Sequence, residues 1–319
     1  MNVVVTGSIA YDYLMSFPGF FKDHILPDQI AKLSVSFLVD SMRRQRGGCA
    51  TNIAYNLALL GERPLVMAAA GQDFSEYRAW LEAHGVDTAG VVEVPDEFTA
   101  SFFVSTDREN HQIAFFYTGA MAHAHKLSFR DLQAPADLAI ISPNDPEAMR
   151  KYPRECKELG IPYIYDPSQQ VIRLSGDDLR EGLTGSKLLI VNDYEFEMIR
   201  NKTGMSEEQV LCCTGALTVT RGGQGSTIWT GGQRIDIPVV KPVREADPTG
   251  VGDAYRAGII KGMSLGLPWE TIGRMGSLAA TYVLECPGTQ NHSYTWAEFA
   301  TRYYENFGDA LENTATPRY

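Results

Sequence analysis

Residues 247–253 combine the residue types and spacing most suited to chemistry. Their sequence is Asp-Pro-Thr-Gly-Val-Gly-Asp, and a helical pattern follows directly. Gly250 and Gly252 carry no side chain, so backbone amides there can approach a ligand closely. Amides at a helix start have no acceptor within the helix and lie at the positive end of its dipole, which suits phosphate. Asp253 would then be either a helix cap or a base that takes a proton from a hydroxyl group.

Short apolar strands alternate with helical segments along most of the chain. Strands are predicted at residues 2–6, 65–70, 137–141, 161–165, 187–191 and 216–220. Helices are predicted at residues 51–60, 74–84, 146–159, 195–202, 254–265, 269–285 and 296–307. Such alternation predicts an α/β fold in which helices cover both faces of a central, mostly parallel sheet, as in a Rossmann-like three-layer sandwich.

Two stretches of the chain interrupt this alternation. Residues 30–39 alternate loosely between apolar and polar types, and residues 99–106 and 112–118 are typical of a β-hairpin. No helix separates these strands, which predicts a small antiparallel sheet inserted into the α/β body. We therefore expect a single domain over residues 1–319, with a lid formed by about residues 13–46 and 95–120.

The composition limits the classes of partner. Lys and Arg number 28 and Asp and Glu number 39, so the formal charge of −11 disfavours nucleic acid and anionic membrane surfaces. The five cysteines fit neither a zinc site nor a disulfide framework, and no partner ligands lie near His123 and His125 in the sequence. No signal peptide and no apolar run of about 18 residues is visible, so we expect a cytoplasmic protein.

Four other segments join residues 247–253 in a resemblance to a known family. They are residues 7–12, 47–52 (Gly-Gly-Cys-Ala-Thr-Asn), 192–195 (Asn-Asp-Tyr-Glu) and 219–222 (Val-Thr-Arg-Gly). Together they resemble, in order along the chain, the signatures of the ribokinase-like (pfkB) carbohydrate and nucleoside kinases. The family's D-T-x-G-A-G-D signature becomes D-P-T-G-V-G-D here, and neither Pro248 nor Val251 removes a reacting group. The G-G-x-x-x-N and N-x-x-E signatures are also present, so the resemblance covers nearly the whole chain.

The resemblance implies an ATP-dependent kinase with a ribokinase-like fold. Asp253 would be the general base that activates the acceptor hydroxyl group. The amides of Gly250, Val251 and Gly252 would form an anion hole for the transferring phosphoryl group. Phosphoryl transfer depends mainly on positioning and on stabilisation of charge, and these groups would provide both.

The resemblance also implies a nucleotide site and metal sites. ATP would contact Asn192, Thr220, Arg221, Gly222, Gly225 and Gly250. Asn192 and Glu195 would organise Mg²⁺ through its waters. Asp247, Thr249 and Gly288 would bind a monovalent cation such as K⁺. Two alternatives remain open, because Glu195 would also be a favourable charge in a first helical turn and Arg221 could be solvated.

The substrate is expected at the carboxyl edge of the sheet. Asp12 follows a predicted strand at the edge where open α/β sheets bind ligands, and would accept hydrogen bonds from sugar hydroxyls. By resemblance, Gly47 and Gly48 would let the sugar approach the backbone, and Asn52 would bind a hydroxyl group. The alternatives are an exposed turn for Asp12 and an ordinary turn before a helix for Gly48.

The lid segments favour a nucleoside among the family's substrates. They are rich in aromatic residues: Phe102, Phe103, Phe115, Phe116 and Tyr117. Stacking on a base contributes roughly 1–3 kcal/mol, although these rings could instead pack the lid against the body. Residues 117–121 resemble a Gly-Ala-Met stretch of adenosine kinase-like members, and residues 23–28 and 34–37 resemble the same branch. We therefore expect adenosine first, phosphorylated at its 5′-hydroxyl to AMP, with Phe102, Phe116 and Met121 at the base.

Other functions compete with a nucleoside kinase. A ribokinase- or fructokinase-like sugar kinase shares every motif above, and a non-catalytic nucleotide- or sugar-binding regulator would share the fold. A dinucleotide-dependent oxidoreductase is disfavoured because the first strand lacks the later glycines of G-x-G-x-x-G. The sequence contains no G-x-x-x-x-G-K-[ST], which disfavours a Walker-type kinase. A monomer and a homodimer are both compatible with the sequence.

Overall fold

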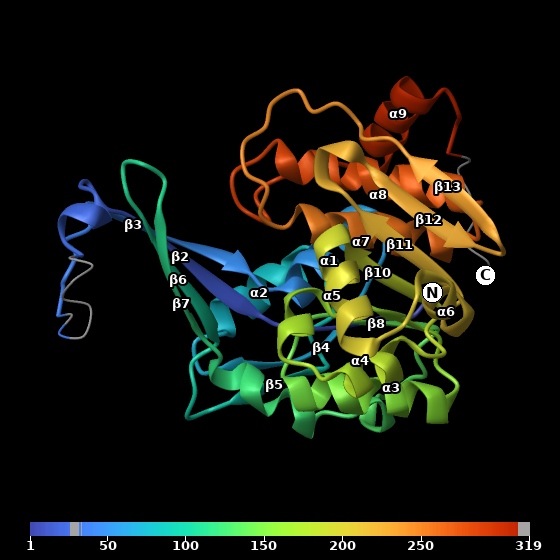
Figure 1. Cartoon of the computed structure of the whole chain (residues 1–319), viewed down its shortest axis with the longest axis horizontal. Coiled ribbons are helices and arrows are strands. Elements are labelled where there is room, and N and C mark those ends of the chain that lie inside the picture. Colours follow the sequence, from blue (N-terminus) through green and yellow to red (C-terminus); the bar gives the residue numbers. More distant parts are fainter. Residues whose placement is uncertain (26–31, 33, 312–319) are drawn as a thin grey trace.

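A large, mostly parallel sheet forms the centre of the computed structural model, which describes residues 1–25, 32 and 34–311 (Figure 1). Its strands, in spatial order, are β13 (Gln233–Ile237), β12 (Ser226–Thr230), β11 (Ala216–Thr220), β10 (Leu188–Asn192), β9 (Tyr163–Tyr165), β8 (Leu138–Ile141), β1 (Val3–Thr6), β4 (Leu65–Gly71) and β5 (Val91–Val94). The seven neighbouring strands β11, β10, β9, β8, β1, β4 and β5 run parallel to one another. Strands β12 and β13 extend the sheet at the β11 edge with antiparallel pairs. The strand order reverses between β1 and β8, and such a switch point is where open α/β sheets bind ligands.

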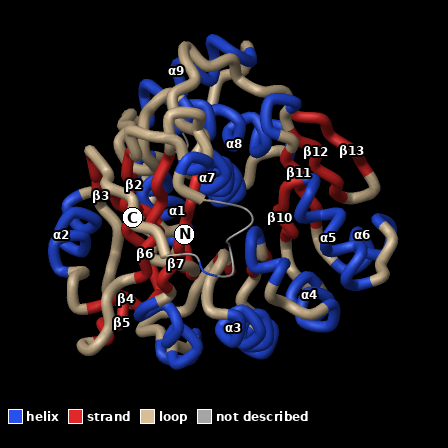
Figure 2. The backbone as a smooth tube through the Cα atoms, turned by 60° about the vertical axis from the view of Figure 1, so that its left-hand side comes forward, coloured by secondary structure: helices blue, strands red, loops and turns tan. Residues whose placement is uncertain are grey.

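Helices cover both faces of this sheet (Figures 1 and 2). One face carries α1 (Cys49–Leu59), α2 (Ser75–Ala83), α7 (Val251–Ser264), α8 (Trp269–Leu284) and α9 (Trp296–Phe307). The other carries α3 (Pro146–Leu159), α4 (Gly176–Leu183), α5 (Asp193–Thr203) and α6 (Glu207–Cys213). The predicted α/β fold with a mostly parallel sheet is confirmed.

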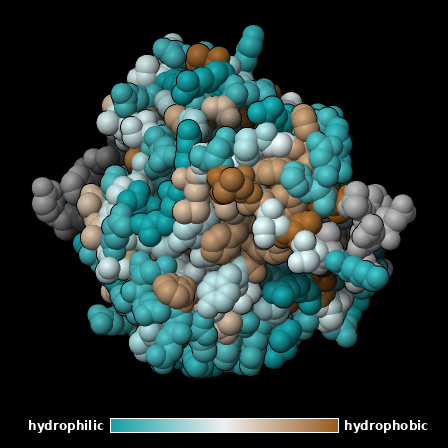
Figure 3. Space-filling model, turned by 90° about the vertical axis from the view of Figure 1, so that its left-hand side faces the viewer, coloured by the Kyte–Doolittle hydropathy of each residue, from teal (hydrophilic) through white to brown (hydrophobic). Residues whose placement is uncertain are grey.

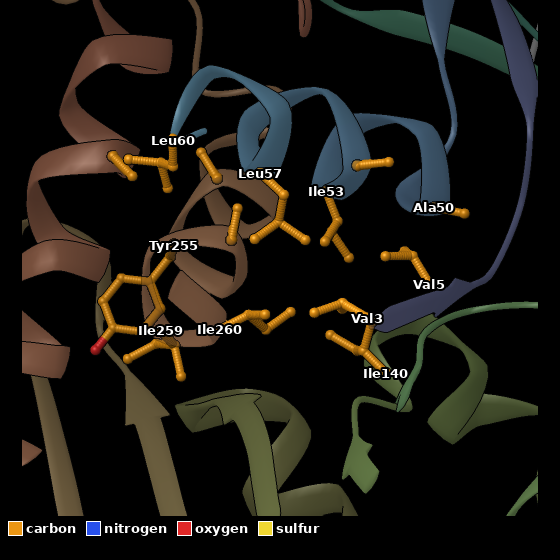
Figure 4. Packing of buried hydrophobic residues seen from close by; sticks show 14 of the residues in the cluster. Val3, Val5, Ala50, Ile53, Leu57, Leu60, Ile140, Tyr255, Ile259 and Ile260 are labelled. Carbon is orange, nitrogen blue, oxygen red and sulfur yellow. The ribbon is translucent and has the colours of Figure 1, made fainter. Parts of the chain in front are cut away.

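Strand β1 shows how the sequence produces two apolar cores. Val3 and Val5 belong to the core beneath α1 and α7, whereas Val4 belongs to the core beneath α3 to α6. Successive side chains of a strand point to opposite faces, so a run of buried Val residues fits a strand covered on both sides. In Figure 4, Val3 and Val5 point toward Ile53 of α1 and Ile260 of α7. This packing fixes the helix that begins at residue 251.

A separate small sheet projects from the body (Figure 1). Its order is β3 (Ser41–Gly47), β2 (Ala10–Ser16), β6 (Ala100–Thr106) and β7 (Gln112–Tyr117). The predicted hairpin is therefore present as β6 and β7. The prediction of a strand at residues 30–39 was wrong for residues 34–39, which form no strand. Residues 30, 31 and 33 lie outside the described residues.

Strands β2 and β3 take the place of that expected strand. Asp12 lies inside β2, not after β1 as predicted from the sequence. β3 reads Ser-Met-Arg-Arg-Gln-Arg-Gly and is mostly exposed, because it lies at the edge of the small sheet. An exposed edge strand needs no apolar alternation, so the sequence pattern gave no signal for it.

Apolar side chains are exposed on the small sheet. They include Met42, Phe115 and Phe116, and Figure 3, which views the molecule from this side, shows hydrophobic surface near the middle of the face. In the part of the chain that the structure describes, no helix is long and apolar enough to span a membrane.

Candidate active site

A cavity of about 560 Å³ lies where the small sheet meets the carboxyl edge of the large sheet. It collects sequence-predicted residues from five separate parts of the chain: Asp12, Gly48, Asn52, Phe102, Phe116, Met121, Thr249, Gly250 and Asp253. Its wall also contains Ser8 after β1 and Pro143 after β8, the two strands that flank the switch point. All residues that the sequence predicted to bind substrate, except Gly47, thus line this one cavity.

Asp253 lies in the first turn of α7 and faces this cavity. The helix begins after Gly250, which adopts φ +80°, and Asp253 makes no capping hydrogen bond to it. Its Oδ2 instead accepts a hydrogen bond of 2.8 Å from the side-chain amide of Asn52 on α1. Burial raises the pKa of Asp253 to about 7, although the charge of Arg256 opposes this effect. A carboxylate with a pKa near neutrality is suited to accept a proton.

A chain of buried amides holds Asp253 from behind. Asn52 is only 4% exposed, and its Oδ1 accepts a hydrogen bond of 2.7 Å from Nε2 of Gln290. The same Nε2 lies 2.7 Å from the hydroxyl of Tyr77. Asn52 was predicted to bind a substrate hydroxyl, and the structure gives it a second task, because it orients the carboxylate of Asp253.

Asp12 faces the same cavity from the small sheet. A Cβ on Gly47 would lie 2.4 Å from Asp12 Oδ2, so Gly47 leaves the space that this carboxylate occupies. Gly47 itself therefore lies behind Asp12. Burial, followed by the charge of Asp247, raises the pKa of Asp12 to about 6. The group is an anion at neutral pH and can accept hydrogen bonds from hydroxyl groups.

Gly48 separates two crossing segments of backbone beside Asp12. It adopts φ +98°, and a Cβ there would lie 2.5 Å from the carbonyl oxygen of Ser8. Both features require glycine. Gly48 is therefore more than an ordinary turn before α1, because it lets the chain after β1 pass close to the helix start.

Two of the cavity aromatics lie opposite each other on the small sheet. Phe102 of β6 pairs with Phe116 of β7, and both line the cavity. Phe103 instead stacks on Tyr13, with ring centroids 4.7 Å apart. The rings therefore divide between the cavity and packing within the small sheet, as the alternation of side chains along a strand requires.

Of the residues predicted to bind nucleotide, Gly250 lines the cavity, whereas the others lie at or just after the ends of β10 and β11 and are not in its wall. Asn192 and Thr220 occupy paired positions on these strands. Asn192 Oδ1 accepts a hydrogen bond of 2.7 Å from the amide of Glu195, and Glu195 Oε2 accepts one of 2.9 Å from the amide of Asn192. This reciprocal capping box opens α5. Burial raises the pKa of Glu195, and its Oε1 remains outside the capping box.

The turn after β11 holds the other predicted nucleotide contacts. Gly222 and Gly225 both have positive φ, of 52° and 83°, which allows the tight turn into β12. The guanidinium of Arg221 donates to Thr227 Oγ1 at 2.7 Å and lies over the ring of Trp229. In this structure the guanidinium of Arg221 is thus held by two residues of β12.

Asp247 binds the other two residues predicted to hold a monovalent cation, Thr249 and Gly288. Its Oδ1 accepts a hydrogen bond of 2.9 Å from the amide of Thr249, and its Oδ2 accepts one of 3.0 Å from the amide of Gly288. Gly288 has φ +82°, and a Cβ there would meet Asn291 and Gln45. The three residues therefore form one compact corner next to the glycine turn.

The model of the pfkB family carbohydrate kinases matches residues 3–296. The chain belongs to this family. The nucleoside kinase of Methanocaldococcus jannaschii is 30% identical over 306 residues, which are 94% of this chain and 96% of that protein. The enzyme class expected from the sequence, an ATP-dependent carbohydrate or nucleoside kinase, is therefore confirmed.

Solved structures give the same result. The chain is similar to the Burkholderia thailandensis nucleoside kinase in complex with inosine, with a TM-score of 0.87 and 36% identity over 97% of this chain and 99% of that chain. The same enzyme in an ADP-inosine complex gives a TM-score of 0.85 and 38% identity, with 97% of each chain covered. The ribokinase-like fold is therefore confirmed for this pfkB-family member.

Several cavity residues of this kinase were not predicted from the sequence. They are Ser8, Ala10, Cys49, Thr118, Pro143, Gln169, Gln170, Arg173 and Thr289. Gln169 and Gln170 follow β9 within a short helical turn, so the carboxyl end of that strand was the available signal. Gln170 is 6% exposed and its Oε1 has no hydrogen-bond partner among the described residues.

Proposed function

We propose that this kinase transfers the γ-phosphoryl group of ATP to the 5′-hydroxyl of a purine nucleoside, with adenosine, giving AMP, as one substrate. The observation that carries the proposal is one cavity with two carboxylates and two aromatic rings around it. Asp12 and Asp253 would face the hydroxyl-bearing sugar, while Phe102, Phe116 and Met121 would face the base. A free hexose has no planar base that could stack on the aromatic part of this cavity.

The chemistry follows from the carboxylate of Asp12 on β2 and from two features of the segment at α7, the carboxylate of Asp253 and the amides of residues 250–252. The sugar hydroxyls donate to Asp12, which orients the 5′-hydroxyl toward Asp253. Asp253 accepts the proton of that hydroxyl as the oxygen attacks the γ-phosphorus of ATP. The amides of Gly250, Val251 and Gly252 would stabilise the charge on the transferring phosphoryl group, since first-turn amides have no acceptor within the helix. ADP then leaves along the edge formed by β10 and β11.

Two cation sites are part of the proposal. Glu195 keeps one carboxylate oxygen free of its capping box, which fits a carboxylate that orders the waters of Mg²⁺ rather than one that encloses the ion. Mg²⁺ would neutralise phosphate charge when bound. Asp247, Thr249 and Gly288 would hold K⁺ beside the glycine turn. The oxygen donors at both sites suit these cations. Asn192 would contribute by fixing the position of Glu195.

Inosine is a second candidate substrate. The similar Burkholderia kinase was solved with inosine, and here Arg173 lines the cavity with an exposed side chain. A guanidinium pairs well with the O6 and N7 acceptors of a 6-oxopurine, whereas adenine presents an amino group at position 6. The wall of the cavity is thus compatible with a 6-oxopurine as well as with adenine.

The substrate class is tested by a panel read through ADP release. Adenosine, inosine, guanosine, cytidine, ribose and fructose are each incubated with the enzyme, ATP and Mg²⁺. We expect ADP release with at least one purine nucleoside and none above background with ribose or fructose. Turnover of ribose or fructose without any nucleoside would mean that the chain is a sugar kinase.

The pH dependence of kcat/KM should reflect both cavity carboxylates. Asp253, with a pKa of about 7, acts as a base only when ionised, so kcat/KM should fall about tenfold per pH unit below pH 7. Below pH 6 Asp12 is protonated as well, and the fall should steepen. Steady-state kinetics between about pH 5 and 9 test this. A flat profile across pH 6 to 8 would show that no base with a raised pKa takes part.

We also propose that the small sheet acts as the lid of a single kinase domain. Its aromatic residues on the cavity side would close over the base and exclude water from the transferring phosphoryl group. Hydrogen exchange should therefore slow in β6 and β7 when a nucleoside is added. Strand β8 in the body serves as an internal control, since its exchange should stay unchanged. Equal exchange of β6 and β7 with and without nucleoside would contradict a lid.

A further inference from the structure

A buried ion pair lies directly behind the glycine turn. Arg256 follows Asp253 by three residues on α7 and is only 7% exposed, and Asp166 is fully buried. Nε and Nη2 of Arg256 donate to the two carboxylate oxygens of Asp166, with 2.6 Å between Nη2 and Oδ1. Nη2 also donates to Ser168 Oγ at 3.0 Å, and Nη1 donates to the carbonyl of Gly252 at 2.8 Å. One edge of the guanidinium thus binds the carboxylate, while Nη1 binds the turn.

Asp166 is held as firmly as its partner. It follows β9, and the hydroxyl of Ser142, which follows β8, donates to its Oδ2 at 3.0 Å. The hydroxyl of Ser168 donates to its Oδ1 at 2.7 Å. Each carboxylate oxygen therefore accepts from the guanidinium and from a hydroxyl group. The pair connects the ends of two neighbouring strands to the first turn of α7.

Stability alone is a weak reason for this pair. Removing two charges from water offsets most of their attraction, and apolar side chains of similar volume often serve as well. The position of the pair points to another role. Nη1 of Arg256 lies 2.9 Å from the place that a Cβ on residue 252 would occupy, so the guanidinium fills the space behind that glycine. Gly250, at the other end of the same turn, lines the cavity.

The pair also determines the charge around Asp253. Arg256 is the largest influence that lowers the pKa of Asp253 against burial, and the hydrogen bond from Asn52 acts in the same direction. Asp166 and, from β2, Asp12 act in the opposite direction. The half-buried Cys49 on α1 lines the same cavity as Asp253, and burial, followed by the charge of Asp253, raises the pKa of its thiol. Arg256 thus supplies the principal positive charge next to the proposed base.

We propose that the Arg256–Asp166 pair positions the phosphoryl-transfer site by clamping the turn at residues 250–252 from behind and by fixing a positive charge next to Asp253. The proposal rests on the proposed role of Asp253 as the base. Asp253 lines the cavity, whereas neither Arg256 nor Asp166 is among the described residues of its wall. Both are therefore positioning residues, and they act through the turn and through Asp253.

The test compares Arg256→Lys and the double variant Arg256→Met/Asp166→Leu with the unmodified enzyme. Lys keeps the charge but lacks the planar fork that binds both carboxylate oxygens, so kcat should fall about tenfold or more with little change in KM. The double variant removes both buried charges and leaves none unpaired, which preserves the fold. Its kcat at pH 7 should fall roughly 10- to 100-fold because the turn is no longer fixed. The acid limb of its pH profile should move to higher pH.

A second, largely buried ion pair, between α7 and the turn after α1, provides the matched control. Lys261 lies toward the far end of α7, and its Nζ is 2.7 Å from Glu62 Oε1. The variant Lys261→Met/Glu62→Leu should keep the unmodified kcat and the unmodified acid limb. Thermal unfolding of all variants is measured in parallel, so that loss of activity is separated from loss of fold.

Two outcomes would overturn the proposal. A folded Arg256→Met/Asp166→Leu variant with unmodified kcat and pH profile would show that the pair has no part in transfer. A double variant that is unfolded under assay conditions would show that the pair is a structural element. Failure of the underlying function is distinct, because it would appear as full activity in Asp253→Asn. Loss of activity in Asp253→Asn together with an active double variant would remove only the positioning role.

Discussion

Replacement of Asp253 by Asn is expected to lower kcat roughly 10²- to 10⁴-fold, the range that follows loss of a general base. Asn has nearly the same shape, so the cavity wall and the turn should be preserved. The KM for nucleoside should change little, because the carboxylate acts mainly as the proton is transferred. Rapid-quench and steady-state measurements of ADP formation test both numbers. Turnover close to that of the unmodified enzyme would show that Asp253 is not the base.

The control for this variant is the same substitution in the first turn of another helix. Asp177 lies in the first turn of α4, with 92% of its side chain exposed. Asp177→Asn should keep the kcat of the unmodified enzyme. A loss in both variants would indicate that the change acts through helix stability, whereas a loss confined to Asp253→Asn assigns the effect to the cavity.

Asp12→Ala should act on binding rather than on turnover. Each hydrogen bond from a hydroxyl group to a carboxylate contributes about 1.5–3 kcal/mol, so two such bonds correspond to a fall in kcat/KM of roughly 10²–10⁴-fold. Most of this change should appear as a higher KM, because Asp12 holds the sugar before and during transfer.

Dideoxynucleosides test whether Asp12 binds the sugar hydroxyls directly. In the unmodified enzyme a 2′,3′-dideoxynucleoside should be a much poorer substrate than the ribonucleoside. In Asp12→Ala the two should become nearly equivalent, since the partner of the missing hydroxyls is gone. A discrimination that survives unchanged in the variant would place the hydroxyl contacts on other residues. This cycle therefore tests the contact itself, whatever the variant does to stability.

The sequence predicted what is encoded locally. The glycines and Asp of residues 247–253 lie within seven positions, and the strand-helix alternation predicted that they begin a helix beside a sheet edge. The long α7 and α8 helices and the β6–β7 hairpin were predicted for the same reason, because their patterns are complete within each segment.

Contacts between segments that are distant along the chain could not be predicted from a single sequence. Asn52 and Asp253 are 201 positions apart, and no local pattern indicates that their side chains meet. The Arg256–Asp166 pair spans 90 positions, and a lone Arg in a helix gives no sign of being buried. For Glu195 the sequence offered only a favourable charge in a first helical turn as the alternative, and the reciprocal capping box with Asn192 was not predicted. Tertiary packing decides each of these cases.

The central claim is that this cavity places a nucleoside 5′-hydroxyl group next to Asp253. The most direct measurement identifies the product formed from ATP and a purine nucleoside by mass spectrometry and ³¹P NMR, with the matching 5′-deoxynucleoside as control. We predict a nucleoside 5′-monophosphate in equal amount to ADP, and a 5′-deoxynucleoside that competes for binding but gives no phosphorylated product. Phosphorylation of the 5′-deoxynucleoside, or ADP formation without any nucleoside phosphate, would contradict the account.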